Sequence, residues 1–244
     1  MVSVNETRGS KAVRLLTEEF GSGKVIWIRA DVSDERELEE AFKVSTAHWG
    51  ALDIVVNDAG VSDESNPVRV INVNAVGVMQ GTILGFRYMS VAKGGRGGVV
   101  INVASIMGIE PSFMTPAYSG SKAFVIGVGR SFGNQLYCNH NKVRVMTICP
   151  ALTDTDLVKD ESILASRSNE FIPGLKEMSL LQFESLYKQT PDNVGKAVVA
   201  MLNEGDSGSV WVSENEEPPY QVEFPDRKTM KKSSLSTFFD HLFN

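Results

Sequence analysis

The 244-residue sequence is poor in the residues that build metal centres and disulfide frameworks. Its two cysteines, Cys138 and Cys149, lie in apolar surroundings, and its three histidines are spread along the chain without the spacing of metal ligands. We therefore expect reduced, buried thiols and no metal site. No apolar run approaches the roughly 18 residues that a membrane-spanning helix needs, and the N-terminus lacks the apolar region of a secretion signal. These absences predict a cytoplasmic protein without a membrane span.

Positive charge is also in the minority. The chain has 24 lysines and arginines against 30 aspartates and glutamates, which gives a net charge of −6, and no basic stripe is visible. Nucleic acid is therefore not expected as a partner. The hydrophobic fraction of 42% and the charged fraction of 22% are typical of globular proteins. The length fits one α/β domain, or at most two small ones.

Apolar strands alternate with longer helical segments along most of the chain. Strand-like runs occupy 24–32, 52–57, 97–105, 143–150 and 208–214, and helical patterns occupy 6–21, 33–50, 67–92, 117–139 and 191–205. Continuous apolar strands separated by helices indicate a parallel sheet covered on both faces. We predict an α/β fold with a doubly wound parallel sheet over residues 1–214. Residues 215–244 change in composition and are predicted to form a weakly ordered C-terminal tail.

Four polar residues have a spacing that suits proton transfer. Tyr118 stands four residues before Lys122, so the two share a helix face, and a nearby positive charge favours phenolate over phenol. Ser105, at the end of a predicted strand, could hold an alcohol or carbonyl oxygen beside that phenol. Together these groups can interconvert an alcohol and a ketone. The fourth residue, Asn74, lies 31 residues before Ser105. Alternatively, Asn74 only caps or kinks its helix.

Further polar residues follow the other predicted strands. Asp31 follows the first strand, the NDAG turn (57–60) follows the second, and CPALTDT (149–155) follows the fourth. Ligands bind beyond the carboxyl ends of the strands in open parallel sheets, so we expect one site at this edge. Asp31 has a second reading as an acid at the entry of the next helix.

This set of residues resembles the classical short-chain dehydrogenase/reductase family. The likeness rests on the YxxxK motif at 118–122 together with Ser105, Asn74, the NDAG turn and the turn led by Pro150, and it covers about residues 3 to 214. The resemblance implies a Rossmann-like fold, NAD as cofactor, and a small secondary alcohol or ketone as substrate. The Leu, Phe and Met content of the segment 151–189 predicts that this substrate is largely apolar. It also implies a homodimer, in which Gly127, Gly129 and Gly133 would allow close helix packing.

The resemblance assigns a role to each candidate residue. Tyr118 would be the catalytic acid or base, Lys122 would lower its pKa and bind the nicotinamide ribose, Ser105 would orient the substrate oxygen, and Asn74 would support a proton relay through water. Thr115 would join Ser105 in contacting substrate. The cofactor would be held by Tyr118 and Lys122 together with Ala30, Asp31, Val32, Asp58, Thr153, Asp154 and Thr155.

The sequence departs from the family pattern at its start. The family begins with a strand and a TGxxxGxG turn, whereas this chain starts where the second strand should be ending. We therefore expect an N-terminally truncated sheet whose first βαβ unit is incomplete, with exposed apolar strand edges, weak NAD binding and slow turnover. Three readings stay open: an oxidoreductase, a catalytically impaired pseudoenzyme that acts as a dimer partner or ligand-binding protein, and a carrier of an apolar ligand in the segment 151–189.

Overall fold

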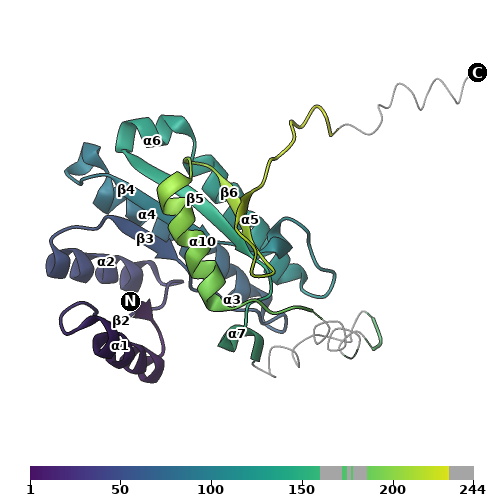
Figure 1. The fold of residues 1–244 in the computed structure, drawn as a ribbon, viewed down its shortest axis with the longest axis horizontal. Helices are drawn as coiled ribbons and strands as arrows, with labels where there is room; N and C mark the ends of the chain where they lie inside the picture. Colours follow the sequence, from purple (N-terminus) through teal and green to yellow (C-terminus); the bar gives the residue numbers. More distant parts are fainter. Residues whose placement is uncertain (160–171, 175–176, 178–185, 231–244) are drawn as a thin grey trace, which may run out of the picture.

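Helices cover both faces of a central sheet in the computed structural model, which describes residues 1–159, 172–174, 177 and 186–230 (Figure 1). The strands are β1 (Val2–Ser3), β2 (Ile28–Arg29), β3 (Ile54–Asn57), β4 (Gly98–Val103), β5 (Val143–Pro150), β6 (Val210–Ser213) and β7 (Tyr220–Gln221). The α-helices are α1 (Glu6–Phe20), α2 (Glu35–Trp49), α3 (Pro67–Ile71), α4 (Gly77–Met89), α5 (Pro116–Phe132), α6 (Gln135–Asn141), α7 (Asp156–Lys159) and α10 (Pro191–Glu204). Single turns of other helix types occupy η1 (Asn72–Val76), η2 (Val91–Lys93) and η3 (Ile106–Gly108).

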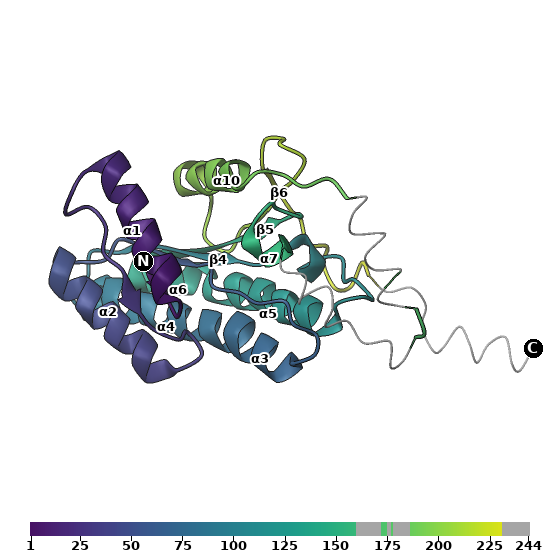
Figure 2. The ribbon, with the colours of Figure 1, turned by 90° about the horizontal axis from the view of Figure 1, so that it is seen from below.

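The main sheet has the strand order β3-β4-β5-β6-β7, in which all neighbours are parallel except the antiparallel edge strand β7. Helices α1 and α10 lie on one side of the sheet, and α2, α4 and α5 lie on the other (Figure 2). This arrangement confirms the predicted α/β fold with a doubly wound parallel sheet. Strand β7 follows the predicted domain boundary at residue 214, and the segment 231–244 lies outside the described residues, so the boundary stays a prediction.

The N-terminal strands form a sheet of their own. Strand β1 pairs in parallel with β2, with Val2 opposite Ile28, and no ladder joins this pair to β3 within the described ranges. The predicted strand at 24–32 is correspondingly reduced to Ile28–Arg29. The outer edge of β3 is left uncovered, and its Ile54 and Val56 side chains are 50% and 46% exposed.

Local sequence signals explain where the helices begin and end. The Asp34 side chain caps α2 by accepting from the backbone N–H groups of Arg36 and Glu37 at 2.9 and 3.0 Å. Gly50 ends this helix in the left-handed conformation, with φ of 82°. The predicted helix 117–139 is instead split into α5 and α6. Gly133 lies against the backbone of Gly208, where a Cβ would approach within 2.2 Å, so the chain turns there.

Strand β5 is buried on both faces, as a central parallel strand requires. Met146 and Ile148 pack with Met201 of α10 on one side, whereas Val143 and Val145 pack with Met89 of α4 on the other. Gly129 allows α5 to approach this strand, since a Cβ at position 129 would lie 1.9 Å from the Thr147 hydroxyl oxygen. The contacts of Gly129 and Gly133 are therefore within the chain, so the expectation that a dimer interface explains them is wrong for these two glycines.

Candidate active site

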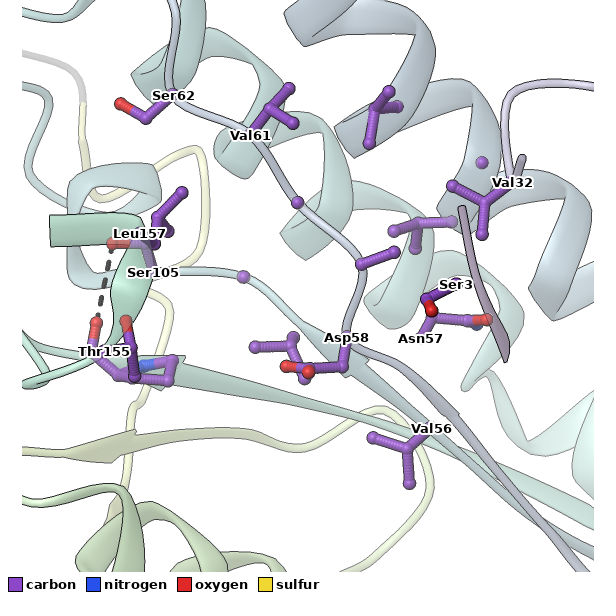
Figure 3. Close-up of a pocket in the computed structure, with 18 of the residues that line it drawn as sticks. Ser3, Val32, Val56, Asn57, Asp58, Val61, Ser62, Ser105, Thr155 and Leu157 are labelled. Atoms are coloured by element: carbon purple, nitrogen blue, oxygen red, sulfur yellow. Dashed lines mark hydrogen bonds between the residues drawn. The ribbon is translucent and has the colours of Figure 1, made fainter. Parts of the chain in front are cut away.

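A cavity of about 1120 Å³ lies beyond the carboxyl ends of the parallel strands. Its wall runs from the end of β1 and the turn after β2, across the NDAG turn after β3, to the end of β4, the start of α5 and the loop after β5. Figure 3 shows Ser105, Thr155 and Leu157 at one end of this pocket, Ser3 and Val32 at the other, and Asp58 between them. The polar strand ends predicted from the sequence therefore meet in one continuous space.

Tyr118 and Lys122 are brought together by helix α5. Tyr118 lies in the first turn and Lys122 follows one turn later, with its ammonium nitrogen 5.5 Å from the centre of the tyrosine ring. The Lys122 Nζ atom donates to the main-chain oxygen of Val103 in β4 at 2.9 Å, and the lysine is only 4% exposed. Both residues line the pocket, so the predicted spacing places an acid–base pair at the cavity wall.

Burial sets the charge states of this pair. Burial raises the pKa of Tyr118 to about 12. A hydrogen bond with Ser105 acts to lower this pKa, and the negative charge of Asp58 acts to raise it further. Burial also lowers the pKa of Lys122 to about 8, although Asp58 and Cys149 act in the opposite direction. The lowering of the tyrosine pKa by Lys122 stays a prediction, because the causes of this net rise are loss of solvation, the Ser105 hydrogen bond and the Asp58 charge.

Ser105 and Thr115 face the same end of the pocket as Tyr118. Ser105 is 8% exposed, and its hydroxyl oxygen accepts from the N–H of Met107 at 3.2 Å, which fixes the turn after β4. Thr115 precedes α5 and is 2% exposed. A substrate oxygen placed beside the Tyr118 phenol would thus lie within the group formed by these two hydroxyl side chains.

Asn74 supports the pocket from behind rather than lining it. It is fully buried in the π-helical turn η1, and its side chain both accepts from the N–H of Val61 and donates to the oxygen of Val61, each at 2.8 Å. Its amide also donates to the Ser121 hydroxyl at 3.1 Å. Asn74 therefore fastens the pocket loop at residue 61 to helix α5, a role that neither capping nor kinking describes.

The structure places most, but not all, of the predicted cofactor residues at the pocket wall. The lining includes Ala30, Asp31, Val32, Asp58, Thr153 and Thr155, but not Asp154, whose side chain lies on the exposed side of its turn. The Asp31 carboxylate accepts from the N–H and the hydroxyl of Ser33 at 2.9 and 2.6 Å. These bonds, with Arg69 and Arg29 nearby, lower the Asp31 pKa. Because Asp34 caps α2, Asp31 is not the helix-entry acid.

Three residues that support the site were not found from the sequence. Ser121 donates to the main-chain oxygen of Tyr118 at 2.7 Å, and Glu64 accepts from the Tyr118 N–H at 2.9 Å. Gln189 is fully buried and donates to the oxygen of Ser213 at 2.7 Å and to the Thr153 hydroxyl at 3.3 Å. Glu64 and Gln189 lie in loops, and a polar loop residue gives no sequence signal of such distant partners, so only the fold reveals them.

Among the described residues, no helix combines the length and the apolar character that crossing a membrane requires. Within the same residues, no group of three or more histidines, cysteines or acids is placed to hold a metal ion.

Sequence comparison relates this chain to known dehydrogenases. A model of the short chain dehydrogenase family matches residues 1–163. Mouse 15-hydroxyprostaglandin dehydrogenase [NAD(+)] is 37% identical over 159 residues, which are 65% of this chain and 59% of that relative. Alcohol dehydrogenase 1 of Ceratitis capitata is 28% identical over 203 residues, 83% of this chain and 77% of the relative. The match to the mouse enzyme thus spans little more than half of its length.

Solved structures agree at the level of the fold. A short chain dehydrogenase/reductase from Burkholderia phymatum in complex with NAD matches with a TM-score of 0.71 and 20% identity, covering 83% of this chain and 75% of that one. Levodione reductase matches with a TM-score of 0.68 and 24% identity, covering 85% of this chain and 81% of that one. With the family model matched over most of the sequence, this chain belongs to the short chain dehydrogenase family.

Proposed function

We propose that this chain is an NAD-dependent dehydrogenase that interconverts a secondary alcohol and a ketone. The observation that carries the proposal is the grouping of Tyr118, Lys122 and Ser105 at one end of a single pocket formed by the strand ends. The relatives support it, because one is named as an NAD(+)-dependent hydroxyprostaglandin dehydrogenase and a structural neighbour was solved with NAD.

The shape and chemistry of the pocket suit an elongated dinucleotide. Its volume of about 1120 Å³ lies just above the roughly 300–1,000 Å³ usual for small-molecule sites. Ala30, Asp31 and Val32 would hold the adenine end, and Asp58 would lie along the ribose. Lys122 would hold the nicotinamide end, with the hydroxyl groups of Thr153 and Thr155. Bound NAD would supply the hydride acceptor for oxidation, and its reduced form the hydride donor for reduction, beside Tyr118.

The residues of the chain would handle the proton. In the reducing direction the protonated Tyr118 phenol donates its proton to the ketone oxygen, while the Ser105 hydroxyl orients that oxygen. In the oxidising direction the phenolate must accept the alcohol proton. Because the Tyr118 pKa is raised to about 12, the phenol is ready as an acid at neutral pH, and alcohol oxidation is expected to accelerate as the pH rises.

The experiment is a calorimetric titration of the purified chain with NAD, followed by turnover assays with a panel of secondary alcohols. Tyr118→Phe should retain NAD binding and lose turnover, because it keeps the ring and removes the proton-transferring oxygen. Tyr137→Phe is the matched control, since Tyr137 is 47% exposed on α6 and does not line the pocket. Wild-type turnover in Tyr118→Phe would refute the proposed role.

A second candidate is a ligand-binding protein with impaired catalysis. It is favoured by the charge states of the site, since a Tyr118 pKa of about 12 and a Lys122 pKa of about 8 leave little phenolate near neutral pH. NAD binding without turnover of any alcohol or ketone up to alkaline pH would decide for this reading. The third reading, an apolar carrier, depends on the segment 151–189, most of which lies outside the described residues.

We also propose a homodimer that forms through α4 and α5. Ile83 of α4 and Phe124 of α5 are 41% and 42% exposed, and Gly127 of α5 has no neighbour within 4 Å of the Cβ position, as close packing of a second helix would require. Light scattering coupled to size exclusion should report twice the chain mass, and Phe124→Glu should shift it to the monomer. A monomeric wild type would refute this assembly.

A further inference from the structure

Helix α5 begins without a cap of its own, although it carries Tyr118. Its N-cap residue, Thr115, makes no side-chain capping bond, and Pro116 at the first position has no N–H to offer. The first backbone donors of the helix that need a partner are therefore those of Ala117 and Tyr118.

Both donors are satisfied by one distant carboxylate. Glu64 Oε2 accepts from the N–H of Ala117 at 3.0 Å, and Glu64 Oε1 accepts from the N–H of Tyr118 at 2.9 Å. Glu64 lies more than fifty residues earlier in the chain, in the segment between β3 and α3. Each carboxylate oxygen thus takes one bond, and the negative charge lies where the helix dipole favours it.

The segment that carries Glu64 is itself held firmly at both ends. At its start, Asn74 bonds both main-chain groups of Val61 at 2.8 Å. At its end, Asn66 caps α3 by accepting from the N–H of Arg69 at 3.1 Å. Val61 and Ser62 line the pocket. Glu64 therefore connects a braced wall of the pocket to the first turn of α5.

The main chain of Tyr118 is consequently fixed on two sides by side chains from outside its own peptide unit. Its N–H donates to Glu64 at 2.9 Å, and its carbonyl oxygen accepts from the Ser121 hydroxyl at 2.7 Å, which in turn accepts from Asn74. We propose that Glu64 is a positioning residue that holds the main chain of Tyr118 at a fixed place relative to the pocket wall. The role of this placement in turnover rests on the dehydrogenase function proposed above, whereas the contact between Glu64 and the helix does not.

The first test measures the contact without any turnover. Hydrogen exchange should accelerate roughly 5- to 30-fold at the amides of Ala117 and Tyr118 in Glu64→Ala, the factor expected for loss of a helix cap. Glu64→Gln keeps one acceptor oxygen and should lie between Ala and the wild type. Glu110→Ala removes an exposed carboxylate from the segment before α5 and should leave this exchange unchanged. Wild-type exchange in Glu64→Ala would overturn the proposal.

The second test follows the phenol. Ultraviolet titration, with Tyr118→Phe subtracted, should show the Tyr118 pKa falling towards its ordinary value in Glu64→Ala, because a loosened helix start admits solvent. If Glu64 acted only through its charge, the Tyr118 pKa would be the same in Glu64→Gln and Glu64→Ala, and that result would overturn a positioning role.

Turnover provides the third readout. We expect kcat to fall by roughly 10- to 100-fold in Glu64→Ala with the KM for NAD little changed, and Glu64→Gln should recover part of the loss. A fall in NAD affinity with unchanged kcat would overturn the proposal. If the wild type has no turnover, the proposed function fails, and the exchange and titration results still decide the role of Glu64.

Discussion

Replacing Gly129 by alanine tests whether α5 is held at its present distance from the sheet. An added Cβ would lie 1.9 Å from the Thr147 Oγ1 atom and 3.3 Å from its Cβ, and Thr147 is fully buried in β5. Carbon needs about 3.5 Å from such a neighbour, so the helix or the strand must move by more than about 1 Å. Overpacking of this kind costs roughly 1–3 kcal/mol and is expected to outweigh the gain in helix propensity of up to about 1 kcal/mol.

Gly120→Ala is the matched control on the same helix. Nothing lies within 4 Å of the Cβ position at Gly120, which is exposed, so only the propensity gain applies. Urea denaturation should show Gly120→Ala stabilised by about 0.5–1 kcal/mol and Gly129→Ala destabilised. Adding Thr147→Ala to Gly129→Ala should recover stability with a coupling of about 0.5–3 kcal/mol. Equal stability of the two single variants would refute the packing argument.

Three further outcomes are expected. Asp58→Asn removes a negative charge that raises the Tyr118 pKa, so the rising limb of alcohol oxidation should move to lower pH by up to about one unit, and an unmoved or higher limb in the pH–rate profile would contradict this. Ile54→Lys places a charge on the uncovered edge of β3, where Ile54 is 50% exposed. Dynamic light scattering should show less concentration-dependent association of this variant than of the wild type, and unchanged association would mean that the chains do not associate through this edge. Gln189→Leu removes the oxygen that accepts from the buried Asn193 side-chain amide at 2.7 Å, which should cost roughly 1–3 kcal/mol in urea unfolding, and wild-type stability would contradict it.

The sequence predicts best where the signal is local and periodic. Strand β5 has the predicted bounds, 143–150, and α2 and α10 begin and end within two residues of the expected positions. Tyr118 and Lys122 share a face because four residues make about one helical turn, which needs no knowledge of the fold. The polar strand ends also converge, because a parallel sheet brings all carboxyl ends to one edge.

The failures come from interactions between segments far apart in the sequence. The break between α5 and α6 depends on the contact of Gly133 with Gly208, and the shortness of β2 depends on a strand having only one neighbour. The raised Tyr118 pKa depends on how deeply the phenol is buried, which spacing does not reveal. Glu64 lies in the polar run SDES, which is typical of a solvated turn, and only the fold brings it to α5.

Because β1 and β2 form a sheet of their own, binding of a ligand at this end of the pocket depends on whether this small unit is folded. Its two strands share a few backbone bonds, such as that from Ile28 to Met1 at 2.9 Å, and have no ladder to the main sheet among the described residues. Units with few such bonds open before the rest of a domain. Because Ala30 and Asp31 belong to this region, a ligand that needs them binds only the closed population, and its apparent dissociation constant is the intrinsic one divided by that fraction. Saturating ligand should in turn protect the amides of residues 26–31 from exchange far more than those of β5.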